Sequence, residues 1–281
     1  MVSCQIEYYT HGLSRFFFLF NREKRKGYNP VEFARELPQK WNELTKKQLL
    51  AIARAQLFKD PHVQQMHLAK HFLNIPFYAL ADMGEDNLQL INEEISKLLE
   101  VNLCTKIFIQ SVITFSGKWI GPKDAGSNMV FVEWINADRY YANYVKTKET
   151  KWLNHLIATL YRPHDKHMSE SHPLYAGDLR VKLNEFHIVN RAKHCRIIPM
   201  ATRIAILLQY VGFRNWLEKK YPETFSEREK KKRVGGMNAL MIDLAGTKMG
   251  ATSDDVAYRP LHEVMIHLEN SALLYNELDK K

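Results

Sequence analysis

"MVFVEWINADRYYANYVKTKETKWLNHLIATLYRP", residues 129–163, is the stretch that decides the fold class. Its large apolar side chains recur every three or four residues, which is the spacing of one face of an α-helix. Phe131, Trp134 and Ile135 begin one such face, and Trp152 and Leu156 lie on another after the charged segment 146–151. The stretch therefore predicts two consecutive helices that end close to a proline, a residue that disfavours helix before it.

Helical patterns also fill the region that precedes this stretch. In "LPQKWNELTKKQLLAIARAQLF", residues 37–58, Thr45 and Gln48 have the spacing of a capping box. In "KDPHVQQMHLAKHFLN", residues 59–74, Asp60 can cap a helix whose first position is Pro61. A third amphipathic pattern covers residues 86–100. We expect a series of helices in the first quarter of the chain.

Helical patterns also follow residue 181. "LNEFHIVNRAKHCRII", residues 183–198, presents Leu183, Phe186 and Val189 on one side of a predicted packing helix. A longer helix is predicted after Pro199, and two shorter amphipathic segments complete the chain.

One segment departs from helical spacing. "CTKIFIQSVITFSGKWIG", residues 104–121, is rich in Ile, Val, Phe and Thr, alternates apolar residues, and is followed by turn-forming residues. We therefore predict a mainly α, multi-helix globular protein with one small β-hairpin or strand element near residues 104–121. We expect a single unit over residues 1–281, with a subdivision into 1–162 and 163–281 as the alternative.

The chain carries a net charge of +9, concentrated in the runs "NREKRKGY" (21–28) and "SEREKKKRVGG" (226–236). Such runs are typical of solvated helix ends or loops, and they also suit contact with a partner protein or with nucleic acid phosphates. The candidate contact residues are Arg22, Lys24, Arg25, Lys26, Arg228, Lys230, Lys231, Lys232 and Arg233.

Composition also bears on the compartment. Three cysteines without a CxxC motif favour a reducing environment. The most hydrophobic run, within "RFFFLFN" at residues 15–21, is far shorter than a membrane-spanning helix. The first residues lack the pattern of a secretory signal. We expect no membrane association.

Histidines are the strongest candidates for chemistry. His164, His167 and His172 lie close together in "YRPHDKHMSESHPLY", residues 161–175, but the serines and prolines around them indicate an exposed connector rather than a rigid metal cage. His67 and His71 have one-turn helical spacing, yet "HLAKH" lacks the glutamate of HExxH. Nucleotide-binding and nucleophile-elbow motifs are also missing. We expect no metal, no cofactor and no enzymatic activity.

Several segments occur in an order that resembles virion or tail-assembly proteins of phages and prophages from Bacteroidota. They are a W-x-E-L-T helix start at residues 41–45, a G-P-x-D turn at 121–124, an aromatic helix ending in L-Y-R-P at 160–163, and an L-A-G segment at 244–246. The resemblance implies a non-enzymatic tail or neck component that docks to other virion proteins. It places the chain in the virion, or in the host cytoplasm during assembly.

Other functions stay open at this point. The first alternative is a tail-assembly chaperone that is absent from the finished particle, and the second is a basic nucleic-acid-binding protein. The third is a metal-dependent enzyme built on the three clustered histidines. Homo-oligomerisation is compatible with each of them.

Overall fold

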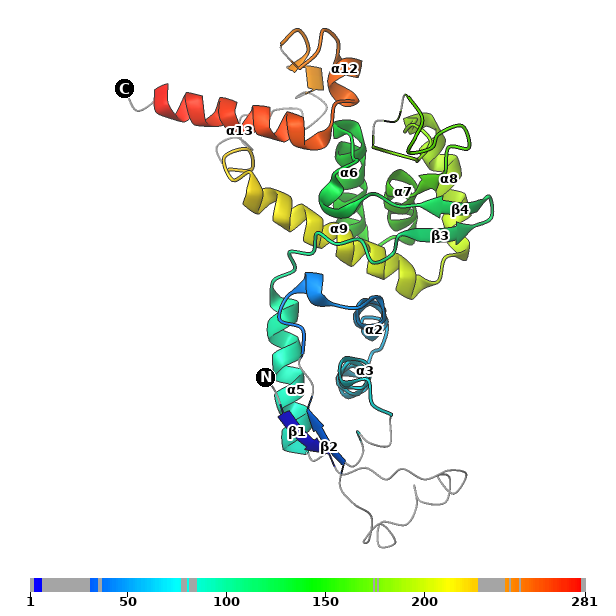
Figure 1. The fold of residues 1–281 in the computed structure, drawn as a ribbon, viewed down its shortest axis with the longest axis vertical. Helices are drawn as coiled ribbons and strands as arrows, with labels where there is room; N and C mark the ends of the chain where they lie inside the picture. Colours follow the sequence, from blue (N-terminus) through cyan, green and yellow to red (C-terminus); the bar gives the residue numbers. More distant parts are fainter. Residues whose placement is uncertain are drawn as a thin grey trace, which may run out of the picture. The chain divides into compact units, whose positions relative to one another are not determined.

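The structure, a computed structural model, describes residues 3–6, 31–34, 37–76, 80, 85–173, 175, 177–226, 241–242, 244–247 and 249–278 (Figure 1). The chain forms two compact units, Met1–Asn102 (unit 1) and Leu103–Lys281 (unit 2). The subdivision considered from the sequence lies between residues 162 and 163, where a short strand, β5 (Arg162–Pro163), occurs. The described part is mainly α-helical, as predicted.

Unit 1 contains three described α-helices. Thr45 caps the first of them through the predicted capping box with Gln48, and Asp60 caps the second. The indole N–H of Trp41 donates to the Leu98 carbonyl at 2.8 Å and so joins the segment before the first helix to the last helix of the unit. The helices are α2 (Lys46–Ala55), α3 (Pro61–Leu73) and α5 (Glu85–Glu100).

Unit 1 also contains a β element that the sequence did not predict. Strands β1 (Ser3–Ile6) and β2 (Val31–Ala34) pair antiparallel, with Ser3 opposite Ala34. Each strand has only four residues, too few for an alternating pattern to be recognised, and its partner lies far away in the sequence. This pairing is an addition to the β element predicted near residues 104–121.

The predicted β element of unit 2 is confirmed as a hairpin. Strands β3 (Ser111–Thr114) and β4 (Gly117–Ile120) pair antiparallel, and β5 adds a third strand beside β4. Gly117 has φ +105°, a conformation that favours glycine at this tight turn. Residues 104–110 do not form strand.

The two helices predicted for residues 129–163 are α6 (Phe131–Thr147) and α7 (Thr150–Leu160), which pack against each other in unit 2 (Figure 1). Trp134 and Leu156 are almost completely buried in the core that they share. The other described helices of unit 2 are α8 (Ile188–His194), α9 (Met200–Lys220), α12 (Ser253–Ala257) and α13 (Leu261–Leu278).

Among the described residues, no helix combines the length and the apolar character that a membrane span requires.

Candidate protein interface

The segment that follows the histidine-rich loop is a nearly continuous helix. A 3-10 turn, η4 (Glu185–His187), leads into α8, and a second 3-10 turn, η5 (Cys195–Ile197), follows it. The Asn184 side chain begins the segment by accepting a hydrogen bond from Phe186 N at 3.0 Å. One side packs into unit 2 and is buried at Leu183, Ile188, Ala192, Cys195 and Ile198.

The opposite side exposes large apolar side chains. Phe186 is 89% exposed, Val189 54% and Ile197 41%. Intervals of three and eight residues place these three side chains along one side of the helix. We call Phe186, Val189 and Ile197 the apolar stripe. Phe186 is the most exposed large hydrophobic side chain among the described residues.

The prediction that Leu183, Phe186 and Val189 share one packing side was wrong, because only Leu183 is buried. The reason is local geometry. The segment is not yet helical at Leu183, because the first 3-10 turn begins at Glu185, so helical spacing does not fix the side of Leu183 relative to Phe186. The spacing that predicts a helix is correct, but it does not distinguish a core face from a face that meets solvent.

Basic side chains surround the apolar stripe. Residues 181–200 contain four Lys or Arg residues, and Glu185 is their sole carboxylate. Arg191, Lys193 and Arg196 form no ion pair with any carboxylate of the described residues. Lys193 and Arg196 are exposed, whereas Arg191 is partly buried. The surface therefore combines the apolar stripe with positively charged side chains next to it.

A buried group of charges anchors this region of unit 2. Glu133, on α6, is completely buried and accepts hydrogen bonds from two guanidinium groups. Arg180 donates to both of its carboxylate oxygens, at 2.6 and 3.1 Å, and Arg162 donates at 2.9 Å. Such paired, charge-assisted contacts are among the strongest hydrogen bonds in proteins.

Asp178 completes the group from the partly exposed side. It accepts from Arg180 Nε at 2.9 Å and lies 3.3 Å from Arg162 Nη2. Two guanidinium groups thus meet two carboxylates. Burial lowers the pKa of Arg162, whereas at Arg180 attraction to Glu133 and Asp178 outweighs burial and raises the pKa. Both arginines remain charged at neutral pH.

The buried ion pairs of Arg162 and Arg180 lie where the two ends of the histidine-rich loop come together. Arg162 and Arg180 lie at its two ends, where Asp165 N donates to Leu179 O and Val181 N donates to Pro163 O. His164 and His167 are exposed on the loop, in agreement with the predicted connector. No group of three or more His, Cys, Asp or Glu side chains suited to a metal is present among the described residues.

His67 and His71 are neighbours on α3, with ring centroids 4.6 Å apart. Burial, with smaller effects from His71 and Arg54, lowers the pKa of His67 to about 4. The folded state therefore favours the neutral ring of His67. The contribution of this ring to the stability of unit 1 is fully present above pH 6.5 and is lost as the pH falls toward 4.

We expect His67→Gln to weaken this pH dependence of unit 1 by about 1 kcal/mol, a small value because solvent screens the half-exposed ring. Urea unfolding of the wild type and the variant at pH 7 and pH 5 measures the difference. His62→Gln, on the same helix, is the matched control. An equal pH dependence in wild type and His67→Gln would contradict the assignment.

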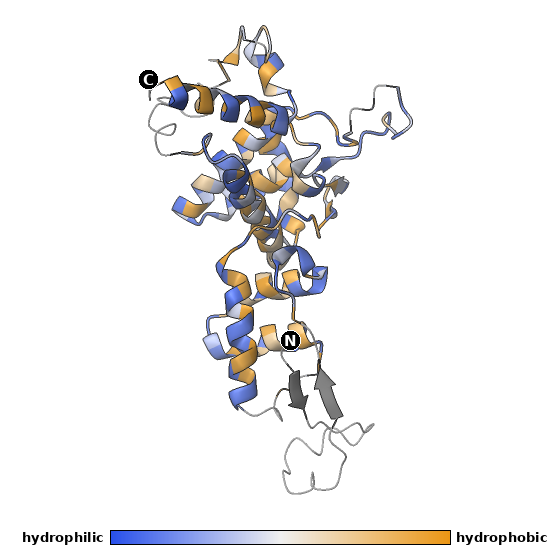
Figure 2. Cartoon of the chain, turned by 60° about the vertical axis from the view of Figure 1, so that its left-hand side comes forward, coloured by the Kyte–Doolittle hydropathy of each residue, from blue (hydrophilic) through white to orange (hydrophobic). Residues whose placement is uncertain are grey.

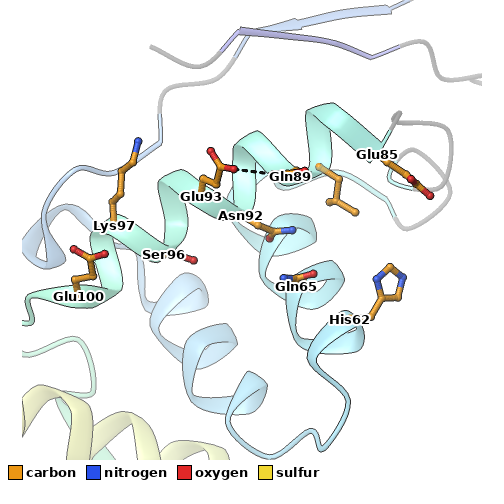
Figure 3. Close-up of a pocket in the computed structure, with 10 residues that line it drawn as sticks. His62, Gln65, Glu85, Gln89, Asn92, Glu93, Ser96, Lys97 and Glu100 are labelled. Atoms are coloured by element: carbon orange, nitrogen blue, oxygen red, sulfur yellow. Dashed lines mark hydrogen bonds between the residues drawn. The ribbon is translucent and has the colours of Figure 1, made fainter.

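Unit 1 has an open groove of about 780 Å³ between α3 and α5 (Figure 3). Its lining residues are polar or charged except for Leu88, with His62 and Gln65 from α3 and a polar face of α5. Gln89 donates to Glu93 within it at 3.0 Å. Small-molecule sites are usually concave and mostly apolar, so this groove has the character of a solvated helix face.

A second exposed apolar face lies on α13. Its buried side includes Leu261, Val264 and Leu268. Hydrophobic residues also recur on the other side, so that they occur along the whole helix (Figure 2). The exposed ones are Ile266, Leu273, Leu274 and Leu278.

The candidate contact residues predicted from charge, in the runs 22–26 and 228–233, lie outside the described residues. The structure instead exposes the apolar stripe, and two of its members, Phe186 and Val189, were predicted to lie on a packing side. A signal was present in the sequence: the helix that carries the stripe has basic residues interleaved on the same side.

Comparison of the chain with protein-family models, curated proteins and solved structures finds no match.

Proposed function

We propose that the chain is a non-enzymatic structural or assembly protein of a phage or prophage particle, a tail or neck component that docks to other virion proteins. The observation that supports docking most strongly is the apolar stripe. Its most exposed member, Phe186, is 89% exposed on a helical segment whose other side is packed into unit 2.

Physical chemistry favours a covered stripe. Covering a large apolar side chain contributes roughly 1.5–3 kcal/mol, and clustered exposed apolar residues are typical of protein-binding surfaces. The exposed residues of α13 offer a second such face. A component with two separate contact faces can bridge neighbouring subunits in an assembly.

The test is the composition of particles made by the genome that encodes the chain. Quantitative mass spectrometry of purified particles, and of assembly intermediates from the same lysate, measures whether the chain is present. Stoichiometric presence in finished particles supports the structural role. Presence in the intermediates alone supports the chaperone alternative, and absence from both would contradict the proposal.

A further inference from the structure

We infer that the apolar stripe receives an acidic segment of a partner protein that carries apolar anchor residues. The inference rests on the proposed docking function and adds the chemistry of the partner. Its basis is the arrangement of uncompensated cations around Phe186, Val189 and Ile197.

The first observation is the exposed charge. Intervals of three and four residues place Lys193 and Arg196 on the same side of the helix as Val189. Lys193 donates to Asn190 Oδ1 at 3.2 Å, a neutral acceptor that leaves its charge uncompensated. A partner that covers the stripe must therefore lie close to two cations.

The second observation is Arg191, on the same helix. Its Nη2 donates to the Asn184 carbonyl at 3.3 Å, and its Nη1 is buried without a hydrogen-bond partner. Burial lowers the pKa of Arg191, so the folded chain holds this charge at a cost.

Charges inside unit 2 do not provide the compensation. The carboxylates of Glu133 and Asp178 are already engaged by Arg162 and Arg180. In that buried group two carboxylates already balance two guanidinium charges, so the charge of Arg191 is an additional positive one. Glu185 is the one carboxylate that residues 181–200 supply against four Lys or Arg residues, so this surface keeps an excess of positive charge that a bound partner can balance.

The apolar stripe favours a protein over nucleic acid or membrane as the partner. Binding of nucleic acid depends chiefly on phosphate neutralisation by several cations and on stacking of bases against aromatic rings. Two of the three stripe residues, Val189 and Ile197, are aliphatic and offer no ring for stacking. The helical segment 185–197 that carries the stripe is shorter than the roughly 20–30 residues of many helices that lie in a membrane interface. Apolar anchors with arginine beside them are typical of protein interfaces.

The experiment is photo-crosslinking in the assembling system. Benzoylphenylalanine at position 186 keeps an aromatic side chain and reacts with whatever covers it, and mass spectrometry identifies the crosslinked segment. We expect a protein segment with more Asp and Glu than Lys and Arg. The double variant Lys193→Glu/Arg196→Glu should reduce the crosslink yield by about tenfold or more.

A matched double variant, Lys146→Glu/Lys219→Glu, changes the net charge equally at two other exposed positions of unit 2 and should leave the yield unchanged. A crosslink to a neutral or basic protein segment, to nucleic acid or to lipid would overturn the inference. An unchanged yield in Lys193→Glu/Arg196→Glu would also overturn it. Failure of the proposed function is distinguishable, because the chain would then be missing from particles and intermediates alike.

Discussion

Replacing Glu133 by Gln is expected to lower the free energy of unfolding of unit 2 by about 3–5 kcal/mol. The carboxylate is completely buried and balances the charges of Arg162 and Arg180. Gln keeps the size of the side chain but removes its negative charge. Two buried guanidinium groups would then share Asp178, and removing one partner from a buried ion pair leaves a charge without compensation.

Urea unfolding followed by tryptophan fluorescence measures this effect, since four of the five tryptophans lie in unit 2. Glu263→Gln is the control. It removes an exposed partner of Arg259, a pair whose loss should cost less than about 1 kcal/mol. A loss at Glu133→Gln as small as that of the control would show that the buried charges do not stabilise unit 2.

Phe186→Asp is expected to leave stability within about 0.5 kcal/mol of the wild type while docking weakens by at least about 30-fold. The side chain is 89% exposed, so its loss creates no cavity in the core. Asp is also acceptable just before α8, because negative charge near a helix N-terminus is favourable. In the bound state, however, a carboxylate would replace the apolar anchor.

The measurement is the amount of chain incorporated into particles or intermediates, together with urea unfolding of the purified variant. Phe115→Asp is the matched control, because Phe115 is 70% exposed in the turn between β3 and β4. We expect normal incorporation of this control. Normal incorporation of Phe186→Asp would remove Phe186 from the interface, whereas a large loss of stability would show a packing role.

The helices of unit 2 were predictable because their apolar residues follow a local period, as in Phe131, Trp134 and Ile135. The hairpin followed from β-branched residues and a turn. The pairing of β1 with β2 was not predictable, since it joins short segments from distant positions. Glu133 gave a signal as a lone charge within "VFVEWI", residues 130–135, but its partners Arg162 and Arg180 are identified only by the fold.

At the candidate interface, too, the sequence predicts the helix but not which of its sides is buried. An apolar residue at helical spacing indicates that a face is covered, but the period does not say whether the covering surface belongs to the same chain. Phe186 and Val189 satisfy the pattern and are exposed. The charged runs are conspicuous in the sequence, yet the exposed cations beside the stripe are two scattered ones, Lys193 and Arg196.

Hydroxyl-radical footprinting tests the central claim, that the apolar stripe is covered by a partner protein, most directly. The rate of oxidation of Phe186 is compared between the purified chain and the chain within isolated particles or assembly intermediates, with exposed Phe115 as internal reference. We predict that assembly lowers the Phe186 rate by about tenfold or more while Phe115 stays reactive, as expected for an anchor in a desolvated interface. Equal oxidation of Phe186 in the free and assembled chain would contradict the claim.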